Sequence, residues 1–152
     1  MKTEMQVLEA LKDAIAEKIE SQYYECDDKA LLEQIKAGNV EIGFPDEDNM
    51  RKNTMFYLTP DYMTYEALGT QSDISCFYIS IFILCKGASP AILLKKAFAY
   101  YTALYCLINK DQTLEGLVDF IDITEADYFP SVGNASLVGI EVKTTVQWTK
   151  EL

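Results

Sequence analysis

Side chains able to carry out acid–base or nucleophilic catalysis are sparse in this sequence. It contains no histidine, so the commonest general base and the usual Ser-His and Cys-His pairs are missing. Asp119 and Asp122 fall in one predicted strand at a spacing that places them on opposite faces, where they cannot act as an acid–base pair. We therefore expect no catalytic residues and a protein that is not an enzyme. An enzyme that works with carboxylates and tyrosines is kept as an alternative.

The candidate metal and cofactor ligands also lack the required spacing. The acidic run at residues 46–49 has the composition of a calcium loop, but the mid-loop glycine and the terminal glutamate are missing. No glycine-rich phosphate-binding motif is present. The four cysteines are too widely spaced for a zinc site and are expected to be buried, free thiols: Cys26, Cys76, Cys85 and Cys106. We expect neither a metal nor a cofactor.

The charge balance argues against several classes of partner. Acidic residues number 24 and basic residues 13, which gives a net charge of −11. A chain this acidic is not expected to bind nucleic acid tightly or to adhere to an anionic membrane. The first 20 residues lack the continuous apolar segment of a signal peptide, and the longest apolar run, 76–85, is too short to span a bilayer. The length of 152 residues predicts a single domain, 1–152.

The elements that must position these side chains begin with helices. Apolar residues recur every three or four positions over residues 3–24, which predicts a helix with Thr3 as its N-cap. A second, short helix is expected over 29–39, followed by a short strand over 39–45 and a polar loop over 46–53. Because Pro60 interrupts the next apolar run, we place a strand only over 62–68.

Residues 74–87 predict a strand that is apolar on both faces. Phe77, Ile79, Ile81 and Ile83 lie on one face, and the other carries Cys76, Tyr78, Ser80, Phe82 and Leu84. Such a strand is central or is covered on both sides. Either the helices of this chain cover both faces, or a neighbouring subunit covers the second one.

The remainder of the chain predicts one long helix and two strands. Ser89 and Pro90 begin a helix with a broad apolar stripe that ends near Asn109. A strand is expected over 116–123, a polar loop over 124–136 and an alternating, half-buried strand over 137–148. Grouped strands between helices predict an α+β fold: a mainly antiparallel sheet with an N-terminal helix and one long central helix packed on it.

Residues 74–150 also present a recognisable order of features. An apolar strand (CFYISIFILCKG) precedes a helix with a stripe of small and aliphatic residues (LLKKAFAYYTALYCLI). A turn then leads into a strand (NKDQTLEGLVDFIDI), and a polar loop into the last strand (LVGIEVKTTVQW). The most specific part is the pattern Asp-x-Thr-Leu-x-Gly, from Asp111 to Gly116. Together these features resemble the tail-terminator (tail-completion) proteins of long-tailed bacteriophages.

The resemblance implies a structural role in virion assembly. Proteins of this family form a ring, commonly of six copies, that caps the finished tail tube, ends tube polymerisation and offers a docking surface for the head connector. The implied partners are other copies of this chain, the tail tube protein and the head connector protein. The implied location is the cytoplasm of the bacterial host during assembly and then the virion tail. An acidic ring would let DNA pass through its lumen without binding it.

Contacts in such a ring are expected on aromatic faces and on a polar loop at residues 127–134. The expected contact residues are Tyr78, Phe82, Tyr100, Tyr105, Asp127, Tyr128, Phe129 and Asn134. Two alternatives remain open: another phage neck or minor capsid (head–tail joining) protein, and a small-ligand-binding α+β module with a pocket between helix and sheet.

Overall fold

A computed structural model describes residues 3–67, 72–131 and 134–151 of the chain. It contains two α-helices and a five-stranded sheet, which confirms the predicted α+β class. The helices are α1 (Glu4–Lys18) and α2 (Pro90–Lys110). The strands are β1 (Val40–Ile42), β2 (Thr54–Ala67), β3 (Ser72–Lys86), β4 (Phe120–Ser131) and β5 (Asn134–Glu151).

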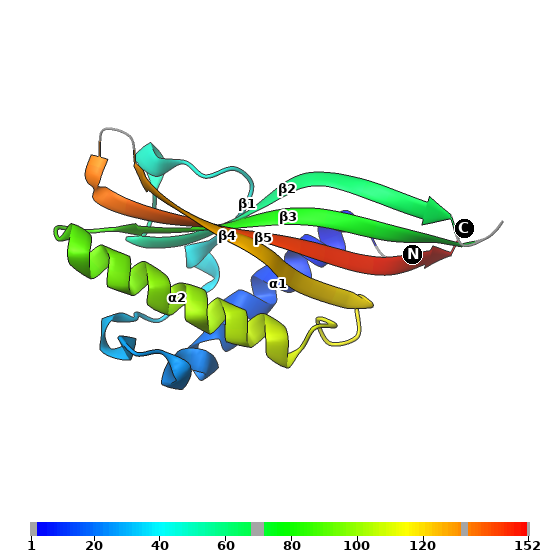
Figure 1. Cartoon of the computed structure of the whole chain (residues 1–152), viewed down its shortest axis with the longest axis horizontal. Helices are drawn as coiled ribbons and strands as arrows, with labels where there is room; N and C mark the ends of the chain where they lie inside the picture. Colours follow the sequence, from blue (N-terminus) through cyan, green and yellow to red (C-terminus); the bar gives the residue numbers. More distant parts are fainter. Residues whose placement is uncertain (1–2, 68–71, 132–133, 152) are drawn as a thin grey trace.

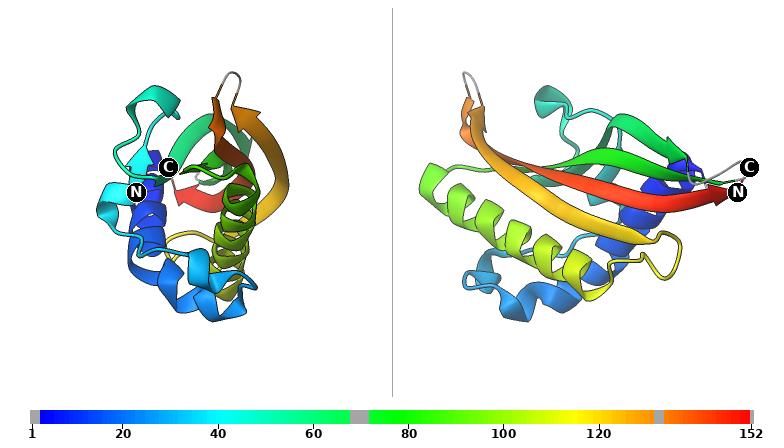
Figure 2. Two further views of the ribbon diagram at one scale, coloured as in Figure 1. Left: turned by 90° about the vertical axis from the view of Figure 1, so that its left-hand side faces the viewer. Right: turned by 45° about the vertical axis from the view of Figure 1, so that its right-hand side comes forward.

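The sheet is antiparallel except at one edge. Its strand order is β1-β2-β3-β5-β4, and only β1 runs parallel to its neighbour β2. Both α-helices lie on one face of the sheet, and within the described residues the other face carries no α-helix (Figures 1 and 2). We call these the helix face and the open face. The strands β2, β3 and β5 reach beyond α2 at one end of the molecule (Figure 1).

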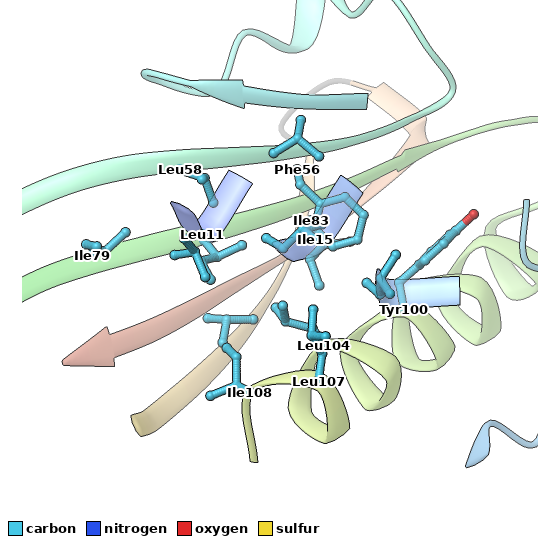
Figure 3. Packing of buried hydrophobic residues seen from close by; sticks show 14 of the residues in the cluster. Leu11, Ile15, Phe56, Leu58, Ile79, Ile83, Tyr100, Leu104, Leu107 and Ile108 are labelled. Carbon is cyan, nitrogen blue, oxygen red and sulfur yellow. The ribbon is translucent and has the colours of Figure 1, made fainter. Parts of the chain in front are cut away.

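The main core lies between the helices and the helix face. Residues from both helices and from β3 meet there (Figure 3): Leu11 and Ile15 of α1, Tyr100 and Leu104 of α2, and Ile79 and Ile83 of β3. Phe77, Ile79, Ile81 and Ile83, expected on one face of their strand, are all buried in this core. The alternation along β5 behaves in the same way, because Ile140, Val142, Val146 and Trp148 are fully buried.

Local signals set the start of α1 but not the structure that follows it. Thr3 and Gln6 form a reciprocal capping box, as a threonine N-cap allows. The α-helix ends at Lys18 and the chain continues as a 3₁₀ helix over Ile19–Glu25. The helix predicted over 29–39 is wrong: the chain forms 3₁₀ turns at Lys29–Leu31 and Ala37–Asn39. Between these turns, the Glu33 backbone N–H donates to the Tyr100 hydroxyl of α2 and the Glu33 carboxylate pairs with Lys96. These contacts with α2 stabilise a non-helical conformation of the segment.

The strand around Pro60 is much longer than predicted. β2 begins at Thr54 and continues through Pro60, with a bulge between Pro60 and Tyr62. β1 pairs with β2 only as far as Leu58. Pro60 therefore lies on an open strand edge, where its missing N–H breaks no ladder hydrogen bond.

The polar loop predicted over 124–136 is also wrong. β4 extends to Ser131 and β5 starts at Asn134, so residues 124–131 and 134–136 belong to two paired strands, and residues 132 and 133 lie outside the described residues. Acidic residues of β4 are stabilised in the strand by Lys143 of β5, whose Nζ lies 3.2 Å from Glu125 and 3.6 Å from Asp127. Cross-strand ion pairs of this kind offset the low strand propensity of aspartate and glutamate.

The helices of this chain do not cover the second face of β3, which corrects one of the two expectations. A small cluster of Met55, Tyr57, Leu84 and Leu137 is buried on the open face, with Met50, Phe82 and Phe129 packed against it. The hairpin end of β4 and β5 bends over this face (Figure 1). Phe129 lies directly over Gly139, where a Cβ atom would overlap its ring. The chain thus covers one end of its open face with its own hairpin and loop.

Candidate assembly surface

Helix α2 is apolar on more of its circumference than the core can cover. Its inward side buries Leu93, Ala97, Tyr100, Leu104, Leu107 and Ile108. A second apolar stripe, with spacings of four, three and four residues, lies beside it: Leu94, Phe98, Tyr101 and Tyr105, of which Tyr101 is half-buried against the core and the others are exposed. Leu94 and Phe98 are each 41% exposed and Tyr105 is 49% exposed.

Strand β4 extends this second stripe with an aromatic side chain. The Tyr128 ring packs on Phe98 with a centroid distance of 4.8 Å and is 49% exposed. Tyr101 and Tyr105 are also in contact, at 6.2 Å between ring centroids. We call Leu94, Phe98, Tyr101, Tyr105 and Tyr128 the α2–β4 surface. A contiguous group of aromatic and aliphatic side chains, most of them exposed, is typical of a protein–protein contact.

The electrostatics of this surface keep it uncharged. The pKa of Tyr101 is raised, mainly because its hydroxyl is partly buried and to a smaller extent because the Tyr128 and Tyr105 hydroxyls lie nearby. A tyrosine with a raised pKa is neutral throughout the physiological range. The surface therefore offers apolar area and hydroxyl groups without charge, which suits burial against a second protein.

The open face of the sheet is polar along its middle. Ser80 Oγ lies 2.7 Å from an Asp61 carboxylate oxygen and 3.0 Å from a Glu141 oxygen, and it donates to one of them at a time. Beyond this polar stretch, Tyr62 and Tyr78 stack with ring centroids 4.3 Å apart. The face is thus not a continuous apolar surface.

The edges of the sheet are open over long stretches. Within the described residues, no strand pairs with the outer edge of β2 over residues 59–67. β4 is the last strand at the opposite edge. An open edge presents backbone N–H and C=O groups that a strand of another molecule can pair with.

Tyr100, one of the expected contact residues, belongs to the core instead. It is fully buried, and its ring packs edge-on against Phe56 at 5.8 Å. The Glu33 backbone N–H donates to its hydroxyl at 2.9 Å. The expectation is corrected, because on a helix with two apolar sides the spacing of residues does not tell which side faces the sheet.

The aromatics expected on the second strand face divide between two environments. Phe82 is half-buried, and its ring meets Phe129 edge-on at 6.2 Å in the small cluster described above. Tyr78 lies farther along the open face, in the stack with Tyr62. Phe82 and Phe129 therefore stabilise this chain's own hairpin, and Tyr78 lies outside that cluster.

The remaining expected residues lie on α2, β4 and the start of β5. Tyr105 and Tyr128 belong to the α2–β4 surface. Asp127 pairs with Lys143 on the open face. Asn134 begins β5, and its side chain lies outside the described ones. The sequence analysis did not assign Leu94, Phe98 or Tyr101 to a contact surface. Their spacing of four and three residues, which places them on one side of the helix, could have indicated it.

The Asp-x-Thr-Leu-x-Gly pattern has a structural function in this fold. Asp111 accepts hydrogen bonds from the Thr113 hydroxyl at 2.8 Å and the Glu115 backbone N–H at 2.8 Å. These bonds lower the pKa of the Asp111 carboxyl. They hold Leu114, Glu115 and Gly116 at φ values of 48°, 58° and 83°. The pattern thus makes the turn between α2 and β4 and places Leu114 against the core.

Neither a metal centre nor a thiol site emerges from the described residues. Among them, no group of three or more His, Cys, Asp or Glu side chains could hold a metal ion. The four cysteines are free thiols; Cys26 and Cys85 are buried as expected, whereas Cys76 and Cys106 are only partly buried, which corrects the expectation for these two. Helix α2 is long and apolar enough to cross a bilayer, but half of its most apolar stretch is buried in the fold, as in a core helix.

Comparison with known proteins gives a likeness of fold. No family model matches the sequence, and no curated protein matches it. Among solved structures, the chain is similar to a chain from the virion of a native gene transfer agent particle. The TM-score is 0.50 at 12% sequence identity, and the match covers 87% of this chain and 92% of the other. The α+β fold described above is thus shared with a chain from a virion particle.

Proposed function

We propose that this chain is a structural protein of a phage-like virion and that it acts by assembly rather than catalysis. The observation that carries the proposal is the α2–β4 surface, which leaves two tyrosines, a phenylalanine and a leucine at least 41% exposed beside a sheet with open edges. The shared fold with a chain from a gene transfer agent virion supports the same role. Nearly full coverage of both chains makes the likeness one of the whole fold.

Within that class we propose a ring that caps the tail tube, ends tube growth and presents a docking surface for the head connector. A ring needs a contact between two different surfaces of each copy, so that the interaction repeats and closes. The α2–β4 surface and the open edge of β2 are two such surfaces on different elements. The terminator-like order of features along residues 74–150 supports the tail position.

The charge of the chain fits a ring through which DNA passes. A net charge of −11 gives a lumen that repels phosphate, provided that acidic side chains line it. The acidic residues of the open face, Asp61, Glu125 and Glu141, are candidates for that lining. A basic lumen in a structure of the assembled ring would contradict this part of the proposal.

The experiment that tests assembly is light scattering after size-exclusion chromatography, combined with negative-stain microscopy. We expect the wild-type chain to form closed oligomers, alone or when expressed with the tail tube protein. Phe98→Asp should stay folded and lose the oligomer, because it places a charge in the centre of the α2–β4 surface. Loss of folding instead would assign Phe98 to the core.

A matched control is available outside this surface. Phe44 is 75% exposed on the segment after β1, so Phe44→Asp introduces the same charge on an exposed phenylalanine. We expect this variant to assemble normally. If Phe44→Asp abolishes assembly and Phe98→Asp does not, the contact lies elsewhere and the α2–β4 assignment is wrong.

A neck or minor capsid protein is the second candidate, since it would use the same kind of ring with a different neighbour. Gene order separates the two: tail-tube and tape-measure genes just downstream favour the terminator. Co-purification with purified tail tubes or with the head connector gives the direct test.

A further inference from the structure

A pocket away from the α2–β4 surface lies between the two helices. It has a volume of about 220 Å³ and is bounded by α1, the C-terminal end of α2 and the turn from Asp111 to Glu115. It exists because α1 presents two small residues, Ala10 and Ala14, where larger side chains would fill the space between the helices. The pocket shares no residue with the α2–β4 surface.

The walls of the pocket are apolar and its rim is acidic. The apolar lining comes from Ala10, Leu11, Ala14, Leu107, Ile108 and Leu114. The charged lining consists of four carboxylates, Asp13, Glu17, Asp111 and Glu115, and one ammonium group, Lys18. Lys18 is already paired with Glu115. With one ammonium group against four carboxylates, the rim keeps a net negative charge, which on α1 comes from the exposed Asp13 and Glu17, one helical turn apart.

The volume indicates what kind of group the pocket can hold. An apolar cavity of about 150 Å³ is large enough for a benzene ring. Sites for free small-molecule ligands usually exceed about 300 Å³. A pocket of about 220 Å³ is thus matched to one large side chain rather than to a complete metabolite.

We propose that this pocket binds a segment of a partner protein that carries one large apolar side chain next to lysine or arginine. The apolar side chain would fill the space between Ala14 and Leu107, and the basic neighbour would meet Asp13 and Glu17. The net charge of −11 makes a basic partner favourable at longer range as well. The proposal does not depend on ring formation.

Fluorescence anisotropy with labelled peptides tests the proposal on the full chain. The probes are Lys-Lys-Phe-Lys, the acidic Glu-Glu-Phe-Glu and the apolar-deficient Lys-Lys-Ser-Lys. We expect the first peptide to bind at least about tenfold more tightly than either of the others. No saturable binding of Lys-Lys-Phe-Lys, or equal binding of Lys-Lys-Ser-Lys, would overturn the proposal.

Two variants locate the site. Ala14→Leu fills the pocket and should lower the affinity for Lys-Lys-Phe-Lys about tenfold, with unchanged oligomer size. Glu17→Gln should weaken binding by a smaller factor and make it less sensitive to salt, because it removes one rim charge. Glu9→Gln is the matched control on the same helix outside the pocket. If Glu17→Gln and Glu9→Gln behave alike, the peptide binds elsewhere, whether or not Ala14→Leu folds.

Discussion

The two sides of helix α2 have nearly the same chemistry and different surroundings. The inward side packs on the sheet and holds the fully buried Tyr100 and Leu104. The outward side carries Phe98 and Tyr105, each at least 41% exposed. Apolar composition therefore does not distinguish a core from a contact surface; only the position of the sheet does. The comparison also predicts that the two sides respond to mutation in different ways.

The largest effect is expected from Tyr100→Ala on the inward side. The ring packs on Phe56 and Tyr23, so its removal leaves a cavity and should lower the free energy of unfolding by about 4 kcal/mol. Tyr100→Phe keeps the ring and should cost about 1 kcal/mol, because the hydrogen bond from the Glu33 backbone to the hydroxyl is lost. Urea unfolding measures both. A cost below about 1 kcal/mol for Tyr100→Ala would remove the contrast between the two sides.

The inward side of α2 also contains one buried charged residue, which tests how strongly that side depends on its surroundings. Lys96 is only 8% exposed, and its Nζ lies 3.0 Å from a Glu33 carboxylate oxygen. Glu33→Ala leaves the ammonium group without this partner and should destabilise the chain by about 2 kcal/mol, less than a fully buried pair because Glu33 is largely exposed. The double variant with Lys96→Met should recover most of this loss. Failure to recover would mean that Glu33 acts through packing and not through its charge.

The turn at the end of α2 should make stability depend on pH. The carboxyl of Asp111 has a lowered pKa in the folded chain, so the folded state favours the charged form more than the unfolded state does. The resulting stabilisation is present above about pH 4 and is lost as the pH falls through the lowered pKa. Asp111→Asn should therefore lower the melting temperature at pH 7 and approach the wild type in acid, as the pH falls through the lowered pKa. A constant difference across this range would show that charge is not involved.

The smallest effect on stability is expected on the outward side. Tyr105→Ser removes a ring that is 49% exposed and should change the free energy of unfolding by no more than about 0.5 kcal/mol. The same substitution should weaken assembly, because aromatic contacts carry much of the energy of protein interfaces. Urea unfolding and light scattering on one preparation separate the two effects. A loss of stability as large as that of Tyr100→Ala would show that α2 has one continuous core.

Patterns of two and 3.6 residues predicted the best-defined elements correctly. The alternation along β3 and β5 identified the residues that the core buries, such as Ile81 and Val142. Thr3 and Pro90 marked the starts of the two helices. These signals are local, so they act in the same way in any tertiary setting.

The sequence by itself thus determined the α+β class, the long helix and the broad apolar stripe along it. Only the tertiary structure decided that Tyr100 is core and Phe98 is surface, that Glu125 and Asp127 lie in a strand paired with Lys143, and that Pro60 sits on an open edge. The physical reason is that strand pairing, ion pairing and burial depend on residues distant in the chain. A local pattern records the chemistry of a side chain but not what lies opposite it.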